Sequence, residues 1–173
     1  MKQATSIAAA LAALVLASGA ASAQSAAVGS LMDADGATIG TVTLTQMAQG
    51  VQIVAEASGL PAGVHAFHIH AVGLCEPPFT SAGGHFNPTD TQHGWNNREG
   101  HHAGDLPNVH VQDDGALAIE YFTTAVTLGD GETGLFDEDG AAIVMHQGPD
   151  DYQTDPAGDA GARIACAVIS PSM

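Results

Sequence analysis

Positively charged side chains are almost absent from this chain of 173 residues. There are three of them, Lys2, Arg98 and Arg163, against 19 acidic residues. If Lys2 is removed with the amino-terminal segment described next, two basic residues remain against 19 acidic ones, a formal net charge of −17. So acidic a surface repels nucleic acids and anionic membranes, which excludes both as first expectations for a partner. Solubility in a salty medium is the simplest interpretation of the charge.

Apolar runs long enough to cross a membrane are also missing. The run Ile7–Leu16 is too short to span a bilayer, and it follows the single positive charge of Lys2. Ala21-Ser22-Ala23 then has the small residues at alternate positions that signal peptidases cut. We expect residues 1–23 to be a cleaved secretory signal peptide and the protein to be exported, periplasmic or secreted. A buried amino-terminal helix is the alternative.

Cysteine is scarce, with only Cys75 and Cys166 in the chain. In the oxidising compartment that an exported protein enters, one disulfide between them is the simplest expectation. It would close a loop of about 90 residues, for which chain entropy predicts roughly 4 to 5 kcal/mol of stabilisation. Two free thiols that bind a metal ion are the alternative.

Helical periodicity is absent too, because no stretch keeps a 3.6-residue apolar repeat for three turns. Short alternating segments separated by turn residues predict about eight strands. They are Val28–Met32, Thr38–Thr45, Val51–Ala57, Gly63–His70, Val109–Val111, Ala116–Thr123, Ala141–His146 and Ala162–Ile169. We therefore expect an all-β fold, an eight-stranded antiparallel Greek-key sandwich or flattened barrel.

Two long loops interrupt this pattern, Val72–Pro107 and Gln147–Gly161. Loops of such length without secondary structure are uncommon in compact domains unless they are functional. A disulfide and a bound metal ion could order the first of them. We expect both loops to carry function.

Histidine is the residue type in excess, with nine copies. In the segment Gly63–His70, side chains alternate between the faces of the predicted strand, so His68 and His70 project to the same side. Two imidazoles can reach one metal ion there. A copper or zinc site needs three or four ligands, so partners must come from elsewhere in the chain.

The first long loop supplies such partners. Three histidines and an aspartate follow the spacing His85-x7-His93-x8-His102-x2-Asp105. Three nitrogen ligands and one oxygen ligand make a good tetrahedral zinc site. The absence of a thiolate from this set excludes a zinc finger.

Four segments carry a resemblance to one family: Gly63–His70, Ser81–Pro88, His102–Leu106 and Gly161–Cys166. In that order they resemble the first signature, the bridging-histidine segment, the zinc segment and the carboxy-terminal signature of secreted bacterial copper/zinc superoxide dismutases. The resemblance spans nearly all of the chain after residue 23. It implies that residues 24–173 are one β domain of that family.

The resemblance implies one copper and one zinc ion per chain. The copper ligands would be His68, His70, His85 and His146. The zinc ligands would be His85, His93, His102 and Asp105. His85 would then be shared, its deprotonated imidazole lying between the two ions.

The resemblance also implies a reaction and the residues that assist it. Superoxide would be dismutated to dioxygen and hydrogen peroxide by one-electron cycling of copper, with zinc in a structural role. Arg163 would receive the substrate anion, and His85 would carry a proton. Asp150 would link His68 to His93 and fix their tautomers. Cys75 and Cys166 match the family disulfide, and a homodimer is one form of assembly that the family adopts.

This chain departs from the family pattern in its second long loop. Many members carry lysines there, which draw the anion inward, whereas Gln147–Gly161 has no basic residue and contains Asp150, Asp151, Asp155 and Asp159. We expect weaker electrostatic attraction than is usual in the family. Ala157 stands where a threonine often lines the channel.

Other interpretations stay open at this point. A copper-only relative, a copper-buffering or copper-delivery protein, and a structural β-sandwich that merely binds metal are the alternatives to the enzyme. We expect His65 to bond backbone atoms, and His101 and His110 to face solvent. Trp95 is expected to pack in the loop, with a role in an interface as the alternative.

Overall fold

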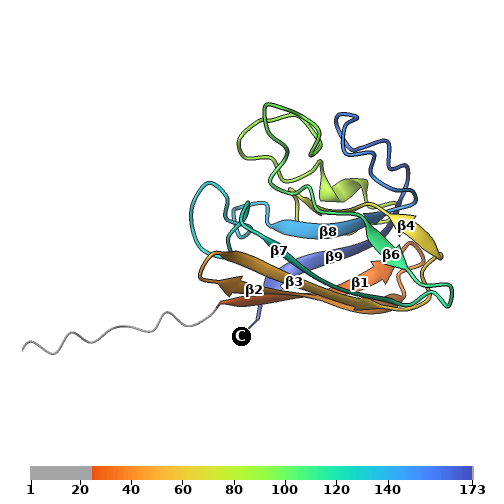
Figure 1. The fold of residues 1–173 in the computed structure, drawn as a ribbon. Helices are drawn as coiled ribbons and strands as arrows, with labels where there is room; N and C mark the ends of the chain where they lie inside the picture. The colour runs from red at the N-terminus through yellow and green to blue at the C-terminus, as the bar shows by residue number, and fades with distance from the viewer. Residues whose placement is uncertain (1–24, 173) are drawn as a thin grey trace, which may run out of the picture.

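The computed structural model describes residues 25–172, which fold into nine strands and one short 3₁₀ helix (Figure 1). The expected signal peptide, residues 1–23, lies outside the described residues. Within the described part of the chain, no helix has the length and apolar character needed to cross a membrane.

All strands pair in an antiparallel sense, which confirms the predicted all-β class. The bounds are β1 Ala26–Asp33, β2 Thr38–Met47, β3 Gly50–Ala57, β4 Gly63–His65, β5 Phe67–His70, β6 Val109–Val111, β7 Leu117–Thr123, β8 Ala141–His146 and β9 Arg163–Pro171, with the 3₁₀ helix η1 at Thr80–Ala82. Seven strands form one curled sheet in the order β5-β8-β9-β1-β2-β3-β7, and β4 pairs with β6 beside it.

Alternation along the sequence decides which face of each strand is buried. In β2, Val42 and Leu44 are fully buried whereas Thr41 and Thr43 are exposed. β8 does not alternate, and all six of its residues are buried. Its Ile143 belongs to the main core, whereas Val144 packs in a second cluster with other buried residues. Both faces of β8 are therefore covered, so its sequence is apolar throughout.

The predicted strand Gly63–His70 is two strands, and this is why the structure has nine instead of eight. β4 pairs with β6, whereas β5 pairs with β8. Between them the Ala66 N–H donates to the Gly148 carbonyl, and the Ala66 carbonyl accepts from the His146 N–H. The chain changes partner at Ala66, and this change places the histidines of β5 beside the end of β8.

The two long loops rise from the same end of the molecule, above β8 (Figure 1). The loop 72–107 contains only η1 as regular structure, as its lack of periodicity predicted. Cys75 in this loop is joined to Cys166 in β9, with an S–S distance of 2.01 Å and 5.7 Å between Cα atoms. The predicted disulfide is confirmed, and the alternative of two free thiols is wrong.

Candidate metal centre

Within the described part of the chain, the first group of possible metal ligands joins two strands and one loop. β5 contributes His68 and His70, the end of β8 contributes His146, and the loop 72–107 contributes His85. One ring nitrogen of each lies within 4.8 Å of the others, and all four side chains are buried. The Nε2 atoms of His70 and His146 are 3.4 Å apart. This is a compact set of four nitrogen donors.

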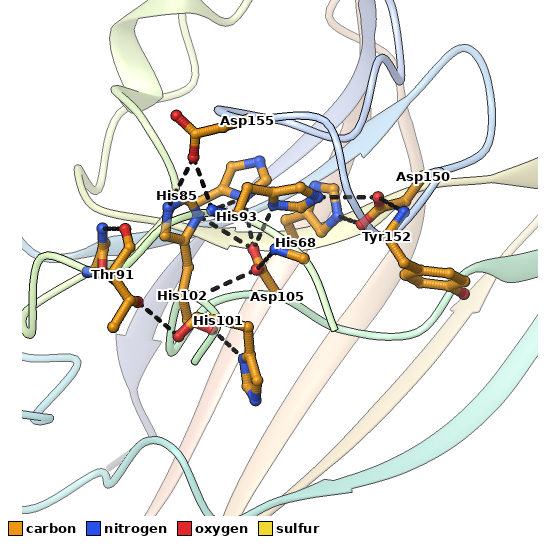
Figure 2. Close-up of polar contacts among 12 residues, drawn as sticks. His68, His85, Thr91, His93, His101, His102, Asp105, Asp150, Tyr152 and Asp155 are labelled. Atoms are coloured by element: carbon orange, nitrogen blue, oxygen red, sulfur yellow. Dashed lines mark hydrogen bonds and ion pairs between the residues drawn. The ribbon is translucent and has the colours of Figure 1, made fainter. Parts of the chain in front are cut away.

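The second group lies entirely within the loop 72–107 and is centred on one carboxylate oxygen. Oδ1 of Asp105 is 2.8 Å from Nδ1 of His85, 3.0 Å from Nδ1 of His93 and 3.3 Å from Nδ1 of His102. Figure 2 shows the three rings converging on this carboxylate. Backbone N–H groups of Gly94 and His102 hold the other oxygen of Asp105, at 2.9 and 3.1 Å.

His85 belongs to both groups, because its two ring nitrogens face in different directions. Nδ1 lies among the donors of the second group, 3.3 Å from Nδ1 of His102. Nε2 is buried and has no hydrogen-bond partner among the described residues. One imidazole therefore connects the two sets of ligands.

Most of these histidines have their other ring nitrogen tied to the protein. Nε2 of His68 and Nε2 of His93 each lie 2.9 Å from an oxygen of Asp150. Nδ1 of His70 is 3.0 Å from the Gly83 carbonyl. A neutral imidazole that donates one N–H to an oxygen acceptor has a lone pair on its other nitrogen, so these bonds point the lone pairs at the clusters.

The structure offers an independent test of whether metal ions suit these residues. His68 Nδ1 and His85 Nε2 are buried side-chain nitrogens without a hydrogen-bond partner among residues 25–172. Buried polar atoms are rarely left unpaired, and a coordinated cation would satisfy both. Four imidazole nitrogens suit copper, and three imidazoles with a carboxylate suit tetrahedral zinc. The residues present fit both ions.

Burial controls the protonation of three histidines in the first group. It lowers the pKa of His70 to about 2, of His146 to about 3 and of His85 to about 4, and neighbouring histidines lower each value further. A proton on any of these rings would bring a charge into a dry site beside other rings. The rings are therefore neutral at pH 7, which is the form that binds a metal.

In the second group, contacts between carboxylates and histidines outweigh the effect of burial on the pKa values. Burial raises the pKa of Asp105, but hydrogen bonds from His102, His85 and His93 outweigh it and hold that pKa well below its usual range. Burial lowers the pKa of His93, but Asp105 and Asp150 outweigh this and raise it to about 9. In the absence of a metal, His93 therefore carries a proton on Nδ1 as well as on Nε2. A cation beside Nδ1 would take the place of that proton.

Arg163, at the start of β9, stands beside the first group. Its two terminal nitrogens donate to the carbonyls of Phe79 and Gly83, both at 2.6 Å. A cleft of about 270 Å³ is lined by Arg163, His85, Ala157 and other residues. The guanidinium is held in one orientation, at the wall of a cleft that reaches the shared histidine.

Three further histidines lie outside both ligand groups, and the structure shows what each of them contacts. Ring nitrogens of His65 lie 2.9 Å from the carbonyls of His146 and Pro61, as its predicted backbone role requires. His110 is exposed, as predicted. The prediction for His101 is wrong: it is half-buried, stacks on Trp95 with ring centroids 3.9 Å apart, and places Nδ1 2.7 Å from the His102 carbonyl.

Sequence reasoning missed two residues that support the site. Asp155 Oδ1 accepts the His93 N–H at 2.7 Å and lies 3.9 Å from Nε2 of His102. Asn108 bonds the backbone of Asp150 with its side-chain amide. Both contacts join segments more than 40 residues apart, so no local pattern could have revealed them.

Comparison with known proteins identifies relatives of this chain. Residues 38–169 match the family described as copper/zinc superoxide dismutase (SODC). The chain is 50% identical over 142 residues to superoxide dismutase [Cu-Zn] 1 of Aquifex aeolicus, covering 80% of this chain and 84% of that protein. It is 44% identical over 139 residues to superoxide dismutase [Cu-Zn] of Caulobacter vibrioides, covering 78% and 80%.

A solved structure agrees with these sequence relatives. The crystal structure of a SOD-like protein from Bacillus subtilis superposes with a TM-score of 0.78 at 39% identity. The match covers 81% of this chain and 95% of that one. The shared architecture thus extends over most of this chain and nearly all of that protein.

Proposed function

The chain belongs to the copper/zinc superoxide dismutase family, and we propose that it converts superoxide to dioxygen and hydrogen peroxide. The observation that carries this proposal is the shared imidazole. His85 presents one ring nitrogen to a set of four imidazoles and the other to a set of three imidazoles and a carboxylate. A protein that only stored copper would need neither the second set nor a residue common to both.

The assignment of ions follows from the donor sets. Copper would be held by His68, His70, His85 and His146, and zinc by His85, His93, His102 and Asp105. Bound copper supplies one-electron redox chemistry, which oxidises one superoxide and reduces a second, whereas zinc has no redox chemistry and holds the loop in place. These roles require the chain to bind an anion and to deliver protons.

Arg163 would bind the anion. Its guanidinium is fixed by two carbonyls and lines the cleft that reaches His85. A small anion entering this cleft can accept a charge-assisted hydrogen bond from it. Because the guanidinium is already oriented, binding the anion requires little reorganisation of the side chain.

His85 would hold the proton that the product takes up. Nε2 is the atom available for this, because Nδ1 faces Asp105 and Nε2 has no partner within the described residues. His85 and Arg163 line the same cleft, so a proton on this ring lies within reach of an anion that Arg163 binds. Asp150 keeps the rings of His68 and His93 in the tautomers that the two ligand sets need.

Metal content and activity measured on the same purified sample test this function. We expect one copper and one zinc per chain, with superoxide consumption that is lost in His146→Ala and retained in His110→Ala, a histidine on the surface. Copper binding without superoxide consumption would support a buffering or delivery protein instead. Copper without zinc would support a copper-only relative.

We propose further that the protein is exported, periplasmic or secreted, after cleavage of residues 1–23. The sequence pattern around Ala21-Ser22-Ala23 supports this, and so does the disulfide, which persists in oxidising compartments. Amino-terminal sequencing of protein from separated cell fractions should give a chain that begins near Gln24. An uncleaved chain in the cytoplasm would contradict the proposal.

We also propose that the protein assembles as a homodimer through an uncharged face. Trp95, Phe122 and Met47 are 51, 64 and 39% exposed, and the hollows that they line share Phe122 and include no acidic side chain. Two copies this acidic repel one another elsewhere, so an uncharged apolar face is where they can meet.

Sedimentation analysis tests the dimer. Phe122→Glu should shift the protein from dimer to monomer. Leu74→Glu is the matched control, since Leu74 is 51% exposed and lines neither of these hollows. A wild-type protein that is monomeric at micromolar concentration would contradict the homodimer.

A further inference from the structure

The carboxylate of Asp150 joins the two ligand groups, although it belongs to a loop without regular secondary structure. One oxygen lies 2.9 Å from Nε2 of His68 and the other 2.9 Å from Nε2 of His93, and the residue is 3% exposed (Figure 2). The loop 147–161 contains no strand or helix to orient it. Other residues must therefore set its position.

Asn108 holds the backbone of Asp150 with two hydrogen bonds. Its side-chain oxygen accepts the Asp150 N–H at 2.8 Å, and its side-chain N–H donates to the Asp150 carbonyl at 2.9 Å. Two such bonds fix both the place and the orientation of this peptide segment. Asn108 makes no contact with a ligand nitrogen in either bond.

Asn108 is itself anchored. Its N–H donates to the hydroxyl of Tyr152 at 2.8 Å, and its carbonyl accepts from the hydroxyl of Tyr121 in β7 at 2.7 Å. Tyr152 in turn donates its own N–H to Oδ1 of Asp150 at 2.6 Å. Hydrogen bonds through Asn108 thus fix the position of Asp150 relative to β7, a strand of the main sheet.

Gly158 has no side chain, and the Asp150 carboxylate occupies the space that a side chain there would fill. A Cβ at position 158 would overlap Oδ1 of Asp150 and come within 2.9 Å of Nε2 of His93. The backbone there has φ of 65°, a left-handed conformation that glycine adopts without strain. Any other residue would have to displace the carboxylate or the loop.

We propose that Asn108 and Gly158 are positioning residues, which together set the Asp150 carboxylate between His68 and His93 and so determine how tightly both metals are held. This inference rests on the proposed assignment of the two ligand groups to metals. Outer partners of ligating histidines affect metal affinity by about 10- to 100-fold when removed.

A pair of glycine substitutions separates positioning from backbone strain. Gly158→Ala and Gly36→Ala both place alanine at a positive φ, 65° and 83°, but a Cβ at position 36 meets nothing within 4 Å. The readout is zinc affinity of the full mature chain, measured with zinc alone against a chromophoric chelator. We expect Gly158→Ala to lose about 10- to 100-fold in affinity and Gly36→Ala to stay within about twofold.

A second variant keeps the inference testable if Gly158→Ala does not fold. Asn108→Asp keeps the shape and the acceptor oxygen but removes the N–H that bonds the Asp150 carbonyl. We expect its zinc affinity to fall in the same direction, with the Nε2–H signals of His68 and His93 in ¹⁵N spectra of the metal-free protein shifted from their wild-type positions.

Failure of the inference and failure of the proposed function give different results. Zinc affinities of Gly158→Ala and Asn108→Asp equal to that of Gly36→Ala, with unchanged Nε2–H signals, would overturn the inference. If the wild-type protein binds both metals but does not consume superoxide, the proposed function fails, and the affinity ratio still decides the inference. Failure of the wild-type chain to bind zinc would overturn both.

Discussion

Each clustered histidine divides its two ring nitrogens between two tasks. In His70, Nδ1 faces the Gly83 carbonyl and Nε2 faces His146. In His68 the order is reversed, because Nε2 faces Asp150 and Nδ1 is the unpaired atom. The choice of nitrogen is thus made by the nearest oxygen acceptor, which is a property of the folded chain and not of the histidine.

The buried rings make the stability of the metal-free protein depend on pH. In the folded chain the pKa values of His70, His146 and His85 are lowered to about 2, 3 and 4, whereas in the unfolded chain each is near 6.5. Below pH 6.5 the unfolded chain takes up protons that the folded chain does not. The free energy of unfolding should therefore fall by about 2 kcal/mol per histidine between pH 6.5 and 5.

Urea denaturation of the metal-free, disulfide-bonded protein at these two pH values measures the effect. The raised pKa of His93 does not interfere, because its stabilisation is fully present below pH 6.5 and is lost as pH rises through about 9. An unfolding free energy that stays constant from pH 6.5 to 5 would show that the rings are not kept neutral by burial.

Arg163 can be tested against the one other basic residue of the described chain. Arg163→Ala removes a charge-assisted hydrogen bond to the anion, worth about 1.5 to 3 kcal/mol, so kcat/KM for superoxide should fall by about 10- to 100-fold. Arg98→Ala makes the same change of net charge at an exposed position and should leave the rate nearly unchanged. Equal losses in both variants would mean that net charge alone matters.

At the scale of elements, β5 and the end of β8 provide a fixed base, and the two loops close over it. The register of β5 with β8, with His68 opposite Val144 and His70 opposite Ala142, sets the distance of His146 from both histidines. The loops are joined to each other by Asn108 and Asp150, and by Asp155 and His93. Strand pairing therefore places the first ligand group, and contacts between loops complete the second.

The acidic loop 147–161 should weaken the attraction of superoxide. Asp150 is turned inward, but Asp151, Asp155 and Asp159 remain exposed, and the loop has no basic residue. Because salt screens attraction and repulsion alike, the rate constant should change little as ionic strength rises from about 0.01 to 0.15 M. Stopped-flow measurement of superoxide decay gives this slope.

Asp159→Lys provides the contrasting variant for this measurement. It places a positive charge on the same loop, so its rate constant should be higher than that of the wild type at low salt and should fall as salt rises. A steep fall with salt in the wild-type protein would show that the copper site and Arg163 attract the anion strongly in spite of the loop.

At the scale of the whole molecule, the disulfide connects the loop that carries the second ligand group to the last strand. Cys75 and Cys166 are 91 residues apart, and Cys166 is buried with Phe79 and Val144 in the second apolar cluster. Closing so long a segment lowers the entropy of the unfolded chain. The bond thereby stabilises the fold and fixes the start of the loop 72–107.

Removal of this bond should destabilise the protein without abolishing the sheet. For the double variant Cys75→Ser/Cys166→Ser we expect a loss of about 4 kcal/mol in the free energy of unfolding, because the unfolded chain regains its freedom. Urea denaturation of both proteins with and without reductant measures it. The wild type should respond to reductant and the variant should not, and equal stabilities of the two oxidised samples would contradict the expectation.

The sequence by itself determined the all-β class, the pairing of the only two cysteines, the family and the residue types of both ligand groups. These follow from alternation, from counts and from short motifs, all of which are local. Tertiary structure alone decided the division of the histidine strand at Ala66, the stacking of His101 on Trp95, and the support of Asp150 by Asn108 and Gly158. The physical reason is that hydrogen bonds and steric exclusion between segments far apart in the chain depend on distances that exist only after folding.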